Sequence, residues 1–79
     1  MFILGIDKNI ALKNFGAHIK QLRKVKKLTQ IEVSSAMQRD QQSLQRVESG
    51  NTNPSLTYLI ELSEAMDISL SELLDFKYL

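Results

Sequence analysis

Three glutamines stand close together in the short stretch DQQSLQRVESG, residues 40–50. A glutamine amide can donate one hydrogen bond and accept another at the same time, which Lys and Glu cannot do. At about 3.6 residues per helical turn, Leu44 and Val47 point one way, and the opposite side carries Gln42, Gln45, Arg46 and Ser49. Gln41 lies at the flank, in the first turn. Surface glutamines are more often simply solvated, but this spacing also suits a helix that offers its amides to a binding partner.

Other kinds of chemistry lack the residues that they need. The chain has no Cys, which excludes disulfides, thiolate metal sites and cysteine nucleophiles. His18 is the single His, so we expect it to be solvated and imply no metal. Ser34, Ser35 and Ser43 have no His and Asp arrangement to activate them. The sequence therefore predicts neither enzymatic activity nor a cofactor.

The charge is unevenly distributed along the 79 residues, although the net charge is only +1. Residues 1–28 hold seven Lys or Arg and one acid, whereas residues 51–79 hold one Lys and five acids. A basic first half suits a polyanionic partner, and an acidic second half suits a face turned away from it. The alternative is that these charges only solvate helix surfaces.

The chain length allows a single domain, and no segment predicts a membrane span. The longest apolar run, MFILGI, is far too short to cross a bilayer and has no basic segment before it, so a signal peptide is not expected either. We expect a soluble, cytoplasmic protein.

Hydrophobic spacing and capping residues predict five helices and no strand. The first runs from about residue 9 to residue 26, with apolar positions at Leu12, Phe15, Ile19 and Leu22. The second begins with the capping box of Thr29 and Glu32, and its expected buried residues are Val33, Ala36 and Met37.

Similar signals mark the last three helices. Asp40 is the natural N-cap of the third, which ends near Ser49 with Gly50 as its stop. The fourth opens near Ser55, and Ser69 with Glu72 forms a capping box for a short fifth helix. The apolar set expected for the fourth helix is Leu56, Leu59, Ile60, Leu62 and Met66.

The second and third helices are short, and Gln38 and Arg39 leave barely a turn between them. Two such helices are typical of the helix-turn-helix, in which the second member enters the DNA major groove. The predicted organisation is an all-α domain over residues 9–75, preceded by an arm (residues 1–8) that is flexible or self-associating, and followed by a tail (residues 76–79).

Three strings resemble the Cro/C1-type (XRE) helix-turn-helix family, which includes the DNA-binding domains of lambdoid phage repressors. They are FGAHIKQLRKVKKLTQ, LTQIEVSSAMQRDQQSLQRVESGNTNPSL and LTYLIELSEAMDISLSELL, and the resemblance covers about residues 12–75. It implies a compact five-helix, lambda-repressor-like fold that binds double-stranded DNA.

The resemblance also implies roles for individual residues. The base-reading positions are Gln41, Gln42, Gln45 and Arg46. The DNA-backbone positions are Thr29, Gln30, Ser43, Asn51 and Asn53. A further matching pair, Arg23 and Glu48, implies a buried ion pair that fastens the first helix to the recognition helix; the plainer reading of Arg23 is an exposed base.

The sequence departs from the family pattern at the turns. Gln38 and Arg39 stand where a Gly and an aliphatic residue are usual, Ser34 replaces a usual Ala, and Lys27 replaces a frequent Gly. Gln38 adopts a left-handed conformation only at some cost, so either it bears that cost or the turn is reshaped. The departures bear on the angle of the recognition helix rather than on the fold.

A glutamine amide matches the donor and acceptor of an adenine edge in the major groove. We therefore assign base reading to Gln41, Gln42 and Gln45, and expect Gln30→Ala to weaken binding to all DNA sequences about equally. A two-fold dimer on a palindrome is expected, with half-sites about 34 Å apart. Its surface is either the N-terminal MFILGI or the apolar C-terminal group Ile68, Leu70, Leu73, Phe76, Tyr78 and Leu79, unless that group closes the core of a monomer.

Two functions from different classes remain open at this point. The first is a small transcriptional repressor that occupies a promoter operator. The second is an antitoxin-like interaction module that masks a protein partner such as a toxin, with DNA binding secondary or lost.

Overall fold

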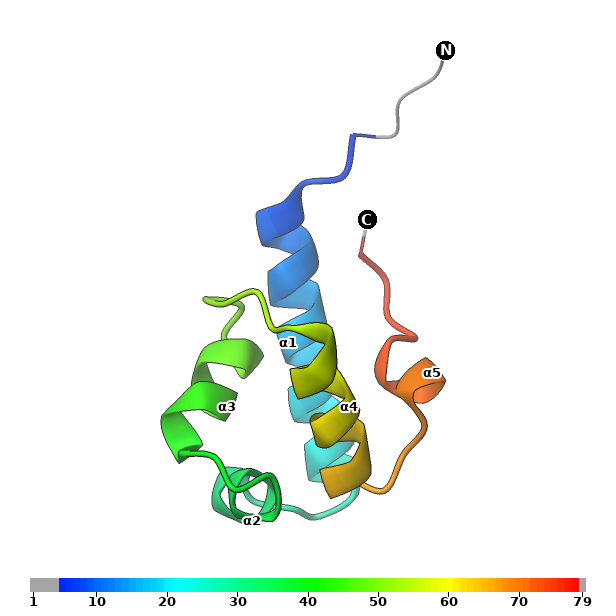
Figure 1. Cartoon of the computed structure of the whole chain (residues 1–79). Coiled ribbons are helices and arrows are strands. Elements are labelled where there is room, and N and C mark those ends of the chain that lie inside the picture. The colour runs from blue at the N-terminus through cyan, green and yellow to red at the C-terminus, as the bar shows by residue number, and fades with distance from the viewer. Residues whose placement is uncertain (1–4, 79) are drawn as a thin grey trace.

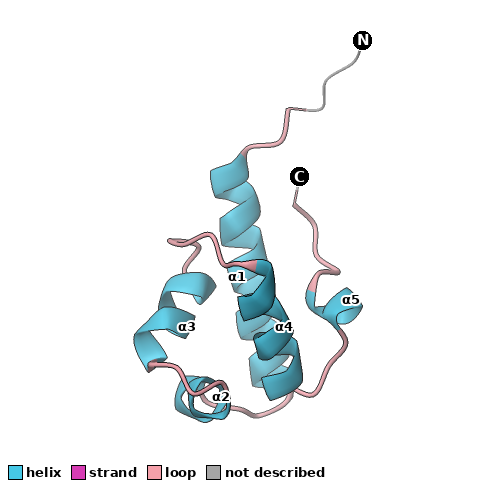
Figure 2. Cartoon of the chain, viewed as in Figure 1, coloured by secondary structure: helices cyan, strands magenta, loops and turns pink. Residues whose placement is uncertain are grey.

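The computed structural model describes residues 5–78, and this part of the chain forms five α-helices and no β-strand (Figures 1 and 2). The helices are α1 (Lys8–Val25), α2 (Gln30–Ala36), α3 (Gln41–Glu48), α4 (Leu56–Ala65) and α5 (Leu70–Leu73). The predicted all-α fold is confirmed. None of the described helices is long and apolar enough to cross a membrane.

The long helix α1 forms the centre of the arrangement (Figure 1). α3 and α5 lie on opposite sides of it, α4 runs alongside it, and α2 lies near its C-terminal end (Figure 1). Direct contacts join α1 to α3, α2 to both α3 and α4, and α4 to α5. α3 is therefore held by α1 and α2 together.

Each helix begins at a side chain that accepts a backbone hydrogen bond, as the sequence predicts for four of them. Thr29 and Glu32 form the complete capping box, whereas Ser69 accepts from Glu72 N–H at 3.0 Å without a recorded return bond. Asp40 and Ser55 cap α3 and α4. α1 starts one residue earlier than expected because the Asp7 carboxylate accepts from the first turn.

The first four helices end in the same way, with a residue of positive φ after the C-cap. These residues are Lys27 (59°), Gln38 (56°), Gly50 (77°) and Asp67 (55°). In each case the next amide donates to a carbonyl five residues back, as Arg39 N–H does to Ser34 at 2.9 Å. Gln38 thus takes the left-handed conformation itself, and the turn between α2 and α3 is not reshaped.

The core is formed by one face of each helix. Its buried apolar residues are Phe15, Ile19, Val33, Met37, Leu44, Val47, Tyr58, Leu62, Met66 and Leu73. Three expected core positions are wrong: Ala36 is exposed, and Leu56 and Ile60 are 62% and 41% exposed. Leu62 and Met66 occupy the face of α4 that meets the core, and Leu56 and Ile60 lie on its other side.

Most of the apolar C-terminal group closes the core of this chain. Leu73 is buried, and Ile68, Leu70 and Phe76 pack against the core. The Phe76 ring lies 5.3 Å from that of Phe15, although the sequence places Phe76 in a tail outside the domain. Tyr78 stays exposed, while Leu79 and the first four residues of MFILGI lie outside the described residues.

His18 is half-buried rather than solvated. Its Nε2 lies 3.2 Å from the carbonyl oxygen of Glu72, and its ring stacks against Phe76 with centroids 6.0 Å apart. The expectation of a solvated His18 is wrong because the C-terminal segment folds back over this side of α1.

Gly16 tests how closely α1 packs on α3. A methyl group at Gly16 would overlap the carbonyl groups of Val47 and Glu48, with the carbonyl carbon of Glu48 2.7 Å away. An alanine normally stabilises a helix interior relative to glycine, but here we expect Gly16→Ala to lower the free energy of unfolding by about 1–3 kcal/mol. Urea unfolding followed by circular dichroism measures it.

The matched control is Gly5→Ala, because an added methyl group there meets nothing within 4 Å. A Gly16→Ala protein as stable as wild type would show that the two helices are not in backbone contact.

Candidate nucleic-acid interface

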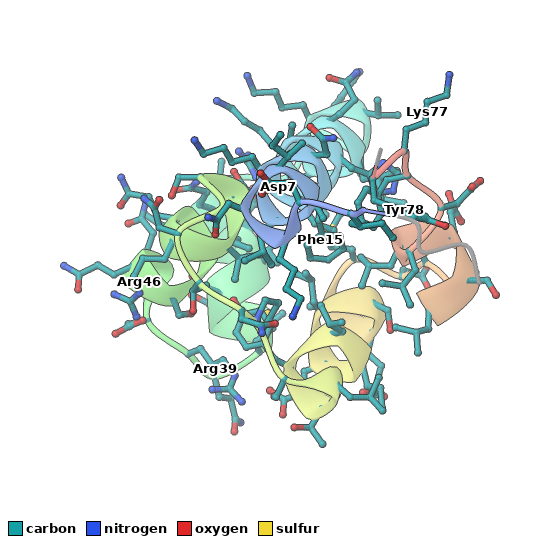
Figure 3. All side chains as sticks on the ribbon, turned by 90° about the horizontal axis from the view of Figure 1, so that it is seen from above. Asp7, Phe15, Arg39, Arg46, Lys77 and Tyr78 are labelled. Atoms are coloured by element: carbon teal, nitrogen blue, oxygen red, sulfur yellow. The ribbon has the colours of Figure 1, made fainter. Side chains whose placement is uncertain are left out.

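The helix α3 buries its apolar side and exposes its polar side. Leu44, Val47 and Glu48 are buried, whereas the exposed side chains are Gln41, Gln42, Gln45, Arg46 and Ser49. Figure 3 shows Arg46 reaching outward from α3, away from α1. All four residues assigned to base reading are therefore accessible from one side of one helix.

A buried ion pair fixes α3 to α1. The Nε of Arg23 donates to Oε2 of Glu48 at 2.7 Å, and its Nη2 donates to Oε1 at 3.0 Å. The remaining Nη1 donates to the carbonyl of Leu28 at 2.8 Å. The hydrogen bond to Glu48 raises the pKa of Arg23 above its ordinary value. This two-bond geometry sets orientation as well as distance between the helices.

Two glutamine amides extend this ion pair toward the surface. The Nε2 of Gln30 donates to Oε1 of Glu48 at 3.0 Å, and Gln30 Oε1 accepts from Nε2 of Gln41 at 3.3 Å. Glu48, Gln30 and Gln41 thus form a hydrogen-bonded line from the buried carboxylate to the exposed start of α3. The bond to Gln30 restricts the orientation of the Gln41 side chain. Gln41 still has a free carbonyl oxygen and one further N–H with which it can bind.

This line was not foreseen from the sequence, which treats Gln30 and Gln41 as residues with separate tasks. The two lie eleven positions apart on different helices, so neither capping rules nor helical spacing relates them. Their pairing follows from the angle at which α2 meets α3.

Arg39 fastens the start of α3 to α4, a role that the sequence did not reveal. Its Nε and Nη2 donate to the two carboxylate oxygens of Glu61 at 2.9 and 3.3 Å. Its guanidinium carbon lies 5.0 Å from the centre of the Tyr58 ring. Both charged side chains are about 40% exposed, so the pair adds little to stability. The sequence did mark this position as unusual, since Arg39 stands where related proteins usually have an aliphatic residue.

The residues expected to bind the DNA backbone differ in how far their side chains are already hydrogen-bonded within the protein. The Ser43 hydroxyl lies 3.0 Å from the Asp40 carbonyl and 3.3 Å from the Tyr58 hydroxyl, so it is partly occupied inside the protein. Burial raises the pKa of that Tyr58 hydroxyl. The exposed Asn51 donates to Ser49 Oγ at 3.2 Å, and Asn53 is exposed.

Thr29 is held in place at the start of α2. Its N–H donates to Glu32 Oε1 at 2.9 Å, and its Oγ1 accepts from Glu32 N–H at 3.0 Å. The hydrogen bond from the Thr29 backbone lowers the pKa of Glu32 below its ordinary value. The hydroxyl hydrogen of Thr29 is still available to an acceptor such as a phosphate oxygen.

Among the described residues, no group of three His, Asp or Glu could hold a metal ion.

Removing one member of the buried ion pair should destabilise the domain. We expect Glu48→Ala to lower the free energy of unfolding by about 3 kcal/mol or more, because it leaves Arg23 charged and unpaired in the interior. Thermal unfolding measures the loss. The matched control is Glu61→Ala, which removes an exposed partner and should cost less than about 1 kcal/mol. Equal melting temperatures for Glu48→Ala and wild type would contradict the structural role.

Comparison with known proteins identifies the family. A family model described as helix-turn-helix (HTH_3) matches residues 19–73. An uncharacterized HTH-type transcriptional regulator of Sinorhizobium fredii, y4dJ, is 39% identical over 61 residues, which cover 77% of this chain and 79% of that protein.

Solved structures agree with the fold. The restriction-modification controller protein C.AhdI of Aeromonas hydrophila superposes with a TM-score of 0.76 at 34% identity, over 78% of this chain and 94% of that one. The clp gene regulator ClgR of Corynebacterium glutamicum has the same TM-score at 23% identity, over 81% of this chain and 83% of that one. The chain belongs to the Cro/C1-type helix-turn-helix family and has its lambda-repressor-like DNA-binding fold.

Proposed function

We propose that this protein is a sequence-specific transcriptional regulator, a repressor that binds a palindromic operator as a homodimer through residues 41–49. The observation that carries the proposal is the set of exposed amides on α3, the first of which is aimed by a hydrogen-bonded line from the buried Glu48. The similarity to an HTH-type transcriptional regulator and to a restriction-modification controller protein supports it.

Base reading is assigned to the exposed polar side of α3. The free groups of Gln41 and the amides of Gln42 and Gln45 each offer a donor and an acceptor, which is the pattern of an adenine edge in the major groove. Each such pair discriminates against a wrong base by about 1–3 kcal/mol. Arg46, exposed on the same side, reaches a base edge or a phosphate.

Phosphate contacts are assigned to the two ends of α3. Thr29 and Gln30 at the start of α2 lie beside the first turn of α3, and Asn51 and Asn53 follow its last turn. Contacts of this kind position a protein on the duplex without reading sequence. Ser43 is the weakest member of this set, because its hydroxyl already bonds within the protein.

The outer side of α4 is the surface that we assign to a second copy of the chain. Leu56 and Ile60 are one helical turn apart, exposed and uncharged. Part of the C-terminal group, once a candidate for this surface, is used in the core instead. Since one recognition helix reads few base pairs, a two-fold dimer is what a palindromic operator requires.

Selection from a random duplex library tests the division between reading and positioning. We expect a selected palindrome that contains adenine, and Gln41→Ala should lose preference at one base pair by about 1–3 kcal/mol. The matched control is Asn51→Ala, which should weaken selected and scrambled duplexes by the same factor. If Gln41→Ala and Asn51→Ala both lose the same affinity on the selected and the scrambled duplex, the division between base-reading and positioning residues is wrong. If no duplex is enriched and binding is weak and steeply salt-dependent, DNA is bound without readout, and an antitoxin-like partner becomes the better function.

Sedimentation of the free protein tests the dimer surface. We expect Leu56→Ser with Ile60→Ser to raise the Kd of dimerisation more than about tenfold, because burying one such side chain is worth about 1.5–3 kcal/mol. Val25→Ser with Ile31→Ser is the control, since these apolar residues are also exposed but lie on other helices. A dimer unaffected by the α4 changes would place the interface elsewhere.

A further inference from the structure

Four lysines form a row along one side of α1 and its C-terminal turn. Lys13, Lys20 and Lys24 are separated by seven and four residues, which are the spacings that return to the same side of a helix. Lys27 follows the C-cap, at the left-handed residue that ends α1. All four are exposed. Figure 3 shows nitrogen-tipped side chains extending from α1 on the side away from α4.

This lysine row follows the seam between α1 and α3. Gly16, which lies on the same side of α1, packs its backbone against Val47 and Glu48 of α3. At one end of the row, the backbone of Lys13 is against Gly50, the residue before Asn51. At the other end, Lys27 precedes Thr29 by two residues. The row therefore connects the two segments that are assigned to phosphate contacts.

No acidic side chain neutralises the row within residues 5–78. The ion pairs in this part of the chain are Arg23 with Glu48 and Arg39 with Glu61. Lys26, which belongs to another side of α1, instead donates to the carbonyl of Asp67 at 3.0 Å. Like charges one turn apart destabilise a helix, so the row carries a cost that no local partner offsets.

We propose that the lysine row is a second phosphate-binding track, which follows the DNA backbone beside the groove that α3 enters. This inference rests on the proposed function. The major groove is about 12 Å wide, and α3 with its side chains nearly fills it, so a helix in backbone contact with α3 stands at the wall of the groove. Lysine suits this position because a flexible point charge binds phosphate without a fixed geometry.

The track adds affinity and salt dependence but no sequence preference, because phosphates are the same at every base pair. It also gives a reason for the uneven charge along the chain. The acids of residues 51–79 lie on α4, α5 and their connections, and not along the seam between α1 and α3.

The test measures the binding constant for the selected duplex between 50 and 200 mM salt. Wild type is compared with Lys20→Gln/Lys24→Gln and with the control Lys8→Gln/Lys77→Gln, which removes the same charge elsewhere. Lys8 lines an apolar hollow that also contains Phe76, and Figure 3 shows Lys77 on the far side of the molecule from Arg46.

We expect the row variant to reduce the slope of log K against log salt by about 1.8, since each lost phosphate contact removes about 0.9. Over this salt range the change corresponds to about a tenfold smaller loss of affinity. The control should keep the wild-type slope. Base preference should be the same in all three proteins, and the melting temperature of the row variant should not fall, because its change relieves repulsion.

Equal slopes for the row and control variants would overturn the proposal, because the lysines would then act only through net charge. A loss of slope that Lys20→Arg/Lys24→Arg fails to restore would also overturn it, since charge alone would not explain the effect. If wild type shows no preference among duplexes, the proposed function fails first, and that result is separate from either outcome.

Discussion

The buried pair of Arg23 and Glu48 is the interaction on which the rest of the arrangement depends. It joins the end of the longest helix to the end of the recognition helix through two hydrogen bonds, and a third bond from the same guanidinium holds the loop that leads to α2. Burying two charges is costly unless they are paired and fully hydrogen-bonded. Every buried polar side-chain atom among the described residues has a partner, so this condition is met.

The ion pair also links stability to recognition. Glu48 accepts from Gln30 as well as from Arg23, and Gln30 in turn accepts from Gln41. The buried carboxylate of Glu48, which fastens α3 to α1, therefore also restricts the Gln41 amide at the surface. On the other side of α3, Arg39 and Glu61 brace the turn against α4 through an exposed contact. The recognition helix is thus held by a strong buried ion pair at its end and by a weak exposed ion pair near its start.

Local rules predict the helices well because capping is a local interaction. Thr29, Asp40 and Ser55 start helices where their side-chain oxygens accept from the amide three residues on. The errors occur where distant segments meet. Leu56, Ile60 and Ala36 fit an apolar pattern but are exposed, and His18 is covered by a C-terminal segment 54 residues away. The positions of the candidate site follow from family resemblance, whereas the amide line and the Arg39 brace depend on interhelical angles.

Whether Gln30 directs Gln41 is decided by how well Gln30→Ala discriminates between bases. Binding of this variant would be measured on the selected duplex and on the same duplex with the adenine read by Gln41 replaced. The sequence alone predicts that Gln30→Ala weakens all duplexes equally, but the hydrogen bond from Gln41 to Gln30 changes this expectation. We expect Gln30→Ala to weaken all binding and also to lose much of the preference at that base pair, with little further loss when Gln41→Ala is added. Full retention of the preference in Gln30→Ala would contradict it, and Gln30 would then be a phosphate contact alone.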